Sequence, residues 1–268
     1  MFADEVIREI AKVADELKVE RAALLAVAEV ESGGKVFATV DGEERPLIRF
    51  EGHYFDRRLS GAKRARARAE GLAAPKAGAV ANPAAQAARW AILDRAVAID
   101  RRAALESVSW GLGQVMGAHW DWLGYASVDH LAAEARSGAA GQARLMARFI
   151  DRAGLRPALR THDWPAFARG YNGAGYKANA YHTKMAAAYR RFSVMEIAHQ
   201  AAPPTGAARI LPALDPGTPR TKDTRSRGLC RLARLAERLG AALTGGPTAS
   251  ARGADRGQNG KPLLDRSR

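Results

Sequence analysis

Cysteine is almost missing from this sequence, because Cys230 is the only one among the 268 residues. A single cysteine cannot form an intramolecular disulfide, and it cannot provide the paired thiolates of a zinc site. The six histidines do not change this conclusion, since none falls in the HExxH spacing of a zinc-binding helix. We therefore expect no bound metal ion and no other cofactor.

Long apolar runs are also missing, since no stretch of about 18 apolar residues occurs that could cross a membrane. The N-terminal segment, MFADEVIREIAKVADELKVE, mixes acidic and apolar residues and lacks the apolar core of a signal peptide. We therefore expect the chain to stay in the cytoplasm of the cell that makes it.

Aromatic residues are few, at 7%, whereas alanine and arginine are abundant, and this balance favours helices. The hydrophobic content of 47% is enough for one sizeable core. The net charge of +14 favours polyanionic partners such as nucleic acid, anionic lipid or cell-wall polymers. The sequence has no helix-turn-helix, RNP or zinc pattern, so we expect no nucleic-acid partner.

Residues 193–268 differ in character from the rest of the chain. They contain 13 Lys or Arg and 6 Asp or Glu, so half of the net charge of +14 lies in this segment. Its Pro- and Gly-rich stretches are typical of linkers, and LCRLARLAERLGAAL (229–243) places leucines on one face of a single amphipathic helix. We predict one domain over residues 1–192 and a basic linker or tail over 193–268. The tail helix either packs on the domain or lies on an anionic membrane or envelope surface.

The spacing of apolar residues predicts a mainly helical fold with one small β-ribbon. Asp41-Gly42 is a hairpin signal, so we expect residues 35–50 to form the ribbon. Residues 57–83 look like a surface loop with at most one short helix, and 109–117 like a glycine-rich junction. Helices are expected over 4–18, 20–31 and 84–108, in two or three pieces between 127 and 160, and on both sides of a turn within 164–192.

Glu31 is the principal candidate for chemistry. It lies at the end of the apolar helix RAALLAVAEVE and is followed by Ser32-Gly33-Gly34. Apolar surroundings disfavour the charged form of a carboxyl group and raise its pKa, as a general acid for glycosidic cleavage requires. The two glycines would let a polymeric substrate approach the backbone. The alternative is a solvated glutamate before a glycine C-cap.

Two later motifs support a site around Glu31. In SWGLGQVM (109–116), Trp110 could stack on a sugar face, and Gln114 could hydrogen-bond a substrate amide or position a water. In GYNG (170–173), Tyr171 could hydrogen-bond a carboxyl group from a tight turn. The alternatives are a tightly packed helix start and an ordinary turn. The expected substrate-binding residues are Ser109, Trp110, Gln114, Tyr171 and Asn172.

The order of these motifs, ESGG, SxGLxQ and YNG, resembles the signature of lytic transglycosylases and goose-type lysozymes. More closely, VAEVESGG, RPLIRFEGHYF, SVSWGLGQVMG and ARGYNGAGYKANAYHTK resemble the phage-type N-acetylmuramidase family of endolysins, over roughly residues 5–192. Gly113 departs from the pattern, because a bulkier residue is common there. The resemblance implies a lysozyme-like fold, in which a helical bundle and a small β-ribbon flank a substrate cleft. It also implies that Glu31 is the catalytic glutamate.

A second catalytic carboxylate is expected, but its identity is open. Glu51, which follows Arg49 and precedes His53, could activate a water on the opposite face of the sugar, or it could form a structural ion pair with an arginine. Asp41 lies ten residues after Glu31, a spacing similar to that of phage lysozymes, but we interpret it as a residue of the hairpin turn. We assign Glu51 as the second catalytic residue.

The resemblance implies a peptidoglycan hydrolase of the endolysin type that cleaves the β-1,4 bond between N-acetylmuramic acid and N-acetylglucosamine. We expect it to act on glycan strands as a monomer. The alternatives are a lytic transglycosylase, which forms an anhydro-muramic product, and a cell-wall-binding module without turnover. Without a signal peptide, such an enzyme would wait in the cytoplasm until another protein opens the membrane and releases it to the periplasm and the cell wall.

Overall fold

The structure, a computed structural model, describes residues 1–201 of the chain. Helices make up most of this part, and two small antiparallel sheets lie between them. The α-helices are α1 (Asp4–Leu17), α2 (Arg21–Ser32), α3 (Gly52–Arg58), α4 (Gly61–Ala69), α5 (Gln86–Val97), α6 (Arg101–Glu106), α7 (Val128–Arg136), α8 (Ala139–Arg152), α9 (Arg156–Arg160), α10 (Trp164–Asn172) and α11 (Tyr181–Ala201). The remaining elements are the strands β1 (Phe37–Val40), β2 (Glu43–Pro46), β3 (Ile48–Phe50), β4 (Val108–Trp110) and β5 (Val115–Met116), and the 3-10 turns η1 (Gly117–His119) and η2 (Ala174–Tyr176). The expected fold class, mainly helical with a small β part, is confirmed.

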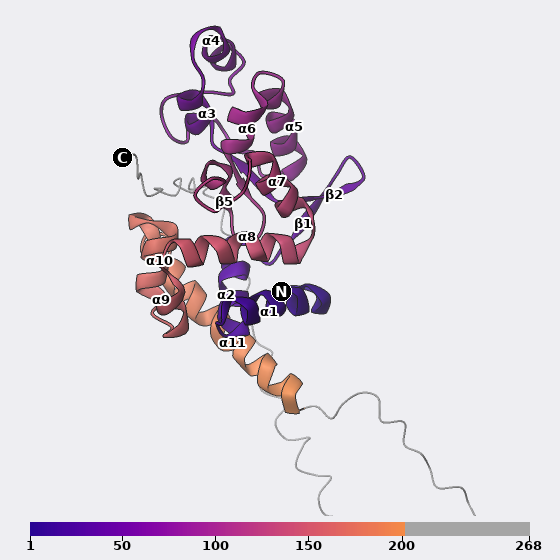
Figure 1. Cartoon of the computed structure of the whole chain (residues 1–268), viewed down its shortest axis with the longest axis vertical. Helices are drawn as coiled ribbons and strands as arrows, with labels where there is room; N and C mark the ends of the chain where they lie inside the picture. The colour runs from indigo at the N-terminus through magenta and orange to yellow at the C-terminus, as the bar shows by residue number, and fades with distance from the viewer. Residues whose placement is uncertain (202–268) are drawn as a thin grey trace, which may run out of the picture. The chain divides into compact units, whose positions relative to one another are not determined.

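Helix α8 crosses the middle of the described unit (Figure 1). On one side of it lie α3 to α7 with the strands, on the other side lie α1, α2, α9 and α11, and α10 lies at one end of it. Helix α2 packs most extensively against α11, and α1 packs on both α2 and α8. The two N-terminal helices are therefore held by helices that come much later in the sequence.

Helices α1 and α2 confirm the two predicted N-terminal helices. One face of α1 is buried, as the spacing of Ile10, Val13 and Leu17 requires. Residues 22–28 of α2 are all buried, which explains why this segment has no polar face. The helix ends at Ser32 because Gly33 adopts a left-handed conformation (φ 66°) that glycine accepts without strain.

The predicted β-ribbon is only partly correct. Strands β1 and β2 form the expected antiparallel hairpin, with Asp41 and Gly42 at positive φ in its turn. Strand β3 does not extend this hairpin, because it pairs with β4, which pairs in turn with β5. Ile48 and Phe50 are almost fully buried, so β3 belongs to the core sheet. The segment 109–117, predicted as a junction, instead supplies most of two strands.

The segment 57–83 contains one short helix, α4, as expected, and it begins with the last two residues of α3. Helix α4 buries only Ala67, so no apolar periodicity marks it in the sequence. Ion pairs stabilise it instead, and Arg68 binds the buried carboxylate of Asp56 with its Nε at 2.6 Å. This contact reaches outside the helix, which is why local sequence patterns do not reveal it.

The predicted helix 84–108 is interrupted between α5 and α6. Asp100 accepts a hydrogen bond from the Ala103 backbone N–H at 3.0 Å and caps the start of α6. The side chain of Asp100 also pairs with Lys63 at 2.7 Å, so this break ties α6 to α4. The cap, rather than a proline or glycine, sets the boundary.

Three helices, α7 to α9, occupy the segment between 127 and 160, as predicted. Helix α11 continues past the predicted domain boundary at 192. Phe192 is buried and Met195 packs against the core, because residues three apart lie on one face of a helix. The predicted boundary at 192 therefore falls inside α11, and the division into a catalytic domain and a tail stays a prediction. The predicted tail helix at 229–243 lies outside the described residues.

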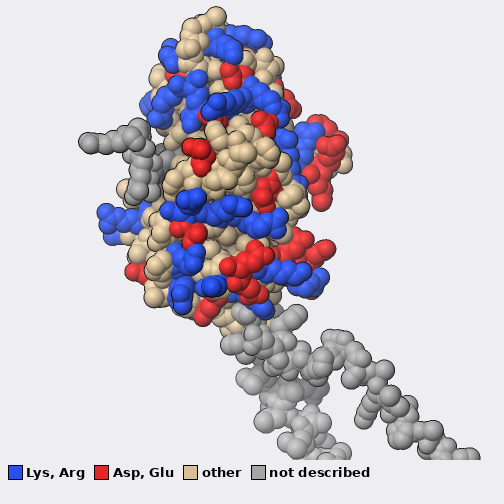
Figure 2. Space-filling model, viewed as in Figure 1, with Lys and Arg blue, Asp and Glu red and all other residues tan. Residues whose placement is uncertain are grey.

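Lysine and arginine predominate at the upper end of Figure 2, where Figure 1 has α3 and α4. An acidic cluster at the right edge of the same view coincides with the β1–β2 hairpin.

None of the described helices is long and apolar enough to cross a membrane. Residues 1–201 also contain no group of three or more His, Cys, Asp or Glu side chains placed to hold a metal ion.

Gly117 joins β5 to η1 at a place where no side chain fits. A Cβ atom at this position would lie 2.1 Å from the carbonyl oxygen of Leu105 in α6. We predict that Gly117→Ala lowers the free energy of unfolding by about 1–3 kcal/mol, because the two backbone segments must move apart. Chemical denaturation followed by circular dichroism measures the change.

Gly175→Ala is the matched control, because nothing lies within 4 Å of a Cβ atom built at that glycine. This change should be neutral or slightly stabilising, since alanine restricts the unfolded chain more than glycine does. An equal loss of stability in both variants would contradict the explanation based on close packing at Gly117.

Candidate active site

Glu31 lies one residue before the end of α2, and it is half-buried. The Ser32 hydroxyl donates back to the Ala28 carbonyl at 2.8 Å, and the Gly34 backbone N–H donates to Ser32 Oγ at 3.2 Å. Side-chain bonds to the backbone of this kind give the end of a helix a defined geometry. The backbone that carries Glu31 is therefore fixed by its own neighbours.

Asn172 is the hydrogen-bond partner of the Glu31 carboxyl group. It is the last residue of α10, it is 3% exposed, and its Nδ2 donates to Glu31 Oε1. Gly173 follows at φ 79°, so the chain turns directly after Asn172. The Oδ1 of Asn172 is buried without a hydrogen-bond partner among the described residues. The third sequence motif is thus brought against the first, and an amide donor orients the carboxyl group.

Tyr171 connects the third motif to the second. Its hydroxyl donates to the Gly113 carbonyl at 2.6 Å, and its ring contacts Phe167 and Phe149 with centroids 5.5 and 5.1 Å away. Burial, followed by the charge of Glu31, raises the pKa of Tyr171 well above its usual value, so the hydroxyl keeps its proton. The expectation that Tyr171 binds a carboxyl group of the substrate is wrong in this structure, because its side chain is buried and its proton bonds the backbone.

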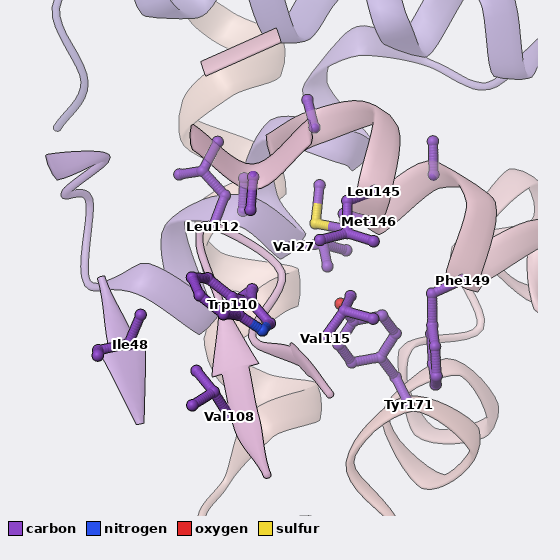
Figure 3. Close-up of a cluster of buried hydrophobic side chains, with 14 of the residues drawn as sticks. Val27, Ile48, Val108, Trp110, Leu112, Val115, Leu145, Met146, Phe149 and Tyr171 are labelled. Carbon is purple, nitrogen blue, oxygen red and sulfur yellow. The ribbon is translucent and has the colours of Figure 1, made fainter. Parts of the chain in front are cut away.

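Trp110 is a core residue. It is fully buried, lies among the apolar side chains of Figure 3, and meets Trp90 edge-on at 6.0 Å. Its indole N–H donates to the Leu105 carbonyl at 3.3 Å. The predicted stacking of Trp110 on a sugar is therefore wrong, because every residue of β4 is buried. Ser109 is likewise buried and donates to Met116 Sδ at 3.1 Å, so it does not face a substrate.

Gln114 differs from these residues, because it is only half-buried. It adopts φ 47°, a left-handed conformation that is uncommon for residues other than glycine. Its Nε2 donates to the Gly111 carbonyl at 2.9 Å, which holds the side chain against the β4–β5 turn. Strained backbone is concentrated at functional sites, so Gln114 stays a candidate ligand of the substrate.

The glycine at position 113 is explained by close packing. A Cβ atom there would lie 2.7 Å from Met146 Cβ and 2.8 Å from the Tyr171 hydroxyl. Gly113 therefore makes room for the hydrogen bond that Tyr171 donates to it. A bulkier residue would separate the second motif from the third.

Gln142 in α8 holds the second motif from the other side, and the sequence analysis missed it. It is 1% exposed, and its Oε1 accepts a hydrogen bond from the Leu112 backbone N–H at 2.9 Å. A Cβ atom at Gly111 would meet Gln142 at 2.8 Å. The sequence does hold a signal for this role. Gln142 lies four residues before the apolar Met146, and residues four apart share one face of a helix, so a polar side chain falls on the buried face.

Glu51 takes part in a buried ion pair. It is 8% exposed, its Oε1 accepts from Arg49 Nε at 2.8 Å, and its Oε2 lies 3.5 Å from His53 Nδ1. Burial lowers the pKa of His53, although the charge of Glu51 opposes this shift. Two interpretations of Glu51 were open, a structural ion pair and a general base. The geometry favours the structural ion pair.

Tyr181, at the start of α11, links the surroundings of the two glutamates. Burial and the charge of Glu31 raise the pKa of Tyr181 to about 12, while Arg49 acts in the opposite direction. The charges of both Glu31 and Arg49 therefore act on the Tyr181 hydroxyl. Tyr181 lies within the segment ARGYNGAGYKANAYHTK, but no role was predicted for it.

Asp41 has the role of a turn residue. Its side chain is 80% exposed and lies 3.8 Å from Arg45, so the turn interpretation is correct.

An apolar groove of about 210 Å³ lies between α1 and α11, with Ile7 and Phe192 in its lining. None of the predicted site residues contributes to this groove. The candidate site is therefore located by the hydrogen bonds around Glu31.

Comparison with known proteins adds to this geometry. A family model described as N-acetylmuramidase matches residues 20–193, a range that contains all three motifs. Among solved structures, the crystal structure of an endolysin from the Burkholderia phage AP3 is similar, at 37% sequence identity and a TM-score of 0.61. The similarity covers 70% of this chain and 71% of that one. No protein with a curated description matches the chain.

The hydroxyl of Tyr171 has a structural role that stability measurements can test. We predict that Tyr171→Phe lowers the free energy of unfolding by about 1–3 kcal/mol, because the buried Gly113 carbonyl loses its donor. Tyr189→Phe is the matched control, since the Tyr189 hydroxyl donates to Glu20 at the surface, where water can replace it. Urea denaturation compares the two variants. A Tyr171→Phe protein with normal stability and reduced activity would return Tyr171 to the substrate-binding residues.

The Glu51 ion pair leads to a second prediction. Glu51→Gln should lower the free energy of unfolding by up to about 3 kcal/mol, because its ion pair with Arg49 in a mostly buried site is lost. Activity at a temperature where the variant stays folded should be largely kept. Glu43→Gln is the control, since it removes an exposed pair with Arg45 and should change stability little. Unchanged melting together with abolished activity would make Glu51 catalytic.

Proposed function

The chain belongs to the N-acetylmuramidase family, and on that premise we propose that it cleaves the β-1,4 bond between N-acetylmuramic acid and N-acetylglucosamine, with Glu31 as the general acid. Family membership makes it a glycoside hydrolase of the lysozyme type, with peptidoglycan as its class of substrate. The similar Burkholderia phage protein is an endolysin, and we extend that role to this chain.

The observation that supports the choice of Glu31 is its hydrogen bond with Asn172. A general acid must present one defined oxygen to the bond that breaks. Asn172 Nδ2 binds Oε1, so the carboxyl group cannot rotate freely and Oε2 takes a fixed direction. No equivalent arrangement surrounds Glu51, whose two oxygens face Arg49 and His53.

In the proposed reaction, protonated Glu31 donates its proton to the glycosidic oxygen as the bond to the sugar carbon breaks. Positive charge then develops on the ring that is left behind, and the newly formed negative charge of Glu31 stabilises it. A water molecule then adds to the sugar carbon and gives a proton back to the Glu31 carboxylate, which completes hydrolysis and restores the acid. We assign the half-buried Gln114 as a polar contact of the substrate. Asn172 is buried, so we assign it to orienting Glu31 instead of the substrate contact expected from the sequence.

Transglycosylation is the second candidate reaction. The observation that favours it is the placement of the other two carboxylates, because Glu51 is paired with Arg49 and Asp41 is exposed in the hairpin turn. In a lytic transglycosylase, a hydroxyl group of the muramic acid attacks in place of water, and one glutamate serves first as acid and then as base. Mass spectrometry of the released muropeptides separates the two reactions, since the anhydro product is lighter than the hydrolysis product by one water.

Glu31→Gln tests the assignment of the acid. We predict that it lowers the rate of peptidoglycan cleavage by at least about 10²-fold, because the amide keeps the shape of the side chain but cannot deliver a proton. Release of soluble muropeptides from purified sacculi measures the rate. Glu16→Gln, on the exposed face of α1, is the matched control and should cleave at the normal rate.

The fold of the Glu31→Gln variant must be checked by circular dichroism and thermal melting. The glutamine side-chain oxygen can still accept the Asn172 hydrogen bond, so the stability should change little. A folded variant that cleaves peptidoglycan at nearly the normal rate would disprove the assignment of Glu31.

A further inference from the structure

Trp122 is the most exposed of the tryptophans in the described part of the chain, at 40%. The others range from fully buried, as Trp110 is, to half-buried, as Trp120 is. A single exposed apolar side chain is common on soluble proteins and indicates nothing by itself. The contacts around Trp122 are what distinguish it.

The turn that carries Trp122 is anchored on both sides. Trp120 donates its indole N–H to Glu106 at 2.9 Å, and Leu123 is 1% exposed in the core. The backbone N–H of Leu123 donates to the His119 carbonyl at 2.8 Å, and further backbone bonds close the turn. The indole of Trp122 is therefore held on a fixed backbone, so a ligand that stacks on it has little conformational freedom to remove.

Aromatic rings connect Trp122 to the candidate active site. Its ring meets Phe149 at 5.7 Å and His119 at 5.6 Å, both edge-on. Phe149 in turn meets Tyr171 at 5.1 Å, and Tyr171 directly precedes the residue that binds the Glu31 carboxyl group. A row of rings thus runs from the exposed indole to the hydrogen bonds that position the acid.

The ring of Trp122 is not covered by a cation from the described residues. Arginines lie over the rings of other tryptophans, as Arg45 does over Trp90 and Arg102 over Trp120, but none of the described Lys or Arg side chains lies over Trp122. Burial, with a smaller contribution from Arg58, lowers the pKa of His119 to about 4, so its imidazole is neutral at physiological pH. The exposed indole therefore has no cation stacked on it, and the adjacent imidazole carries no charge.

We propose that Trp122 is a stacking platform for one sugar ring of the glycan strand, beyond the bond that is cleaved. The proposal rests on the function proposed above, because it takes peptidoglycan as the ligand. A glycan strand is a polymer, so its sugars extend past Glu31 and meet other parts of the surface. The apolar C–H face of a pyranose matches a flat, rigid and uncharged aromatic ring. Contacts with such remote sugars hold the strand in place while the reaction occurs elsewhere.

The first test measures binding without turnover, in the Glu31→Gln background. Co-sedimentation with purified peptidoglycan sacculi should show that Trp122→Ala weakens binding about tenfold, whereas Trp122→Phe keeps most of the affinity. Val194→Ala is the matched control, since Val194 is an apolar residue of α11 that is 67% exposed and lies outside the ring row. Equal affinity of Trp122→Ala and its parent would overturn the proposal.

The second test is spectroscopic, and it decides the matter even if Trp122→Ala fails to fold. Soluble oligomers of N-acetylglucosamine and N-acetylmuramic acid should change the tryptophan fluorescence of the Glu31→Gln protein. The change should be largely lost when Trp122→Phe is added, because the responding indole is gone. A fluorescence change that persists in the Trp122→Phe protein would count against the platform.

Activity of the unmutated chain separates failure of this proposal from failure of the proposed function. In the active background, Trp122→Ala should raise the half-saturating concentration of sacculi about tenfold and leave the saturated rate within about twofold. If the unmutated chain does not cleave peptidoglycan, the proposed function is wrong. If it cleaves peptidoglycan and the Trp122 variants bind normally, only the platform is wrong.

Discussion

The hydrogen bond from the Asn172 amide to the Glu31 carboxyl group is the contact on which the candidate site depends. Asn172 is buried, and a buried polar group without a partner costs about 1–3 kcal/mol, so this contact constrains both ends of the domain. Whatever positions Asn172 also positions Glu31. The turn at Gly173 and the bond from Tyr171 to Gly113 both act on Asn172, and they therefore act on the acid.

The second motif contributes through its small size as much as through its polar groups. Gly111 and Gly113 lie where a side chain would collide with Gln142, Met146 or Tyr171. Because neither glycine carries a side chain, α8 and α10 can both approach the β4–β5 turn, from two directions. The backbone of this turn then bonds with Gln142 on one side and Tyr171 on the other. Its geometry is set by packed neighbours, which is how proteins hold a site on a short loop.

Sequence reasoning identified the helical fold class and the three motifs, because helix periodicity and glycine punctuation are local signals. It failed where the deciding contact is not local. Trp110 looked like an exposed platform, but β4 is buried on both faces and so shows no alternation that would have revealed its burial. Helix α4 lacks an apolar face and is stabilised by partners such as Asp56 and Asp100 outside it. The role of Gln142 depends on a backbone group 30 residues away in the chain.

Glu31 and Asn172 are separated by 141 residues in the sequence, and this distance has a consequence for the order in which the protein is made. During translation the acid is synthesised early, on the second helix, whereas its amide partner follows only with α10. A nascent chain that ends before α10 carries the carboxyl group without the contact that orients it. Closing so long a loop is also slow compared with forming a helix. The active geometry therefore forms only after α10 has been made, and chains that end before α10 lack it.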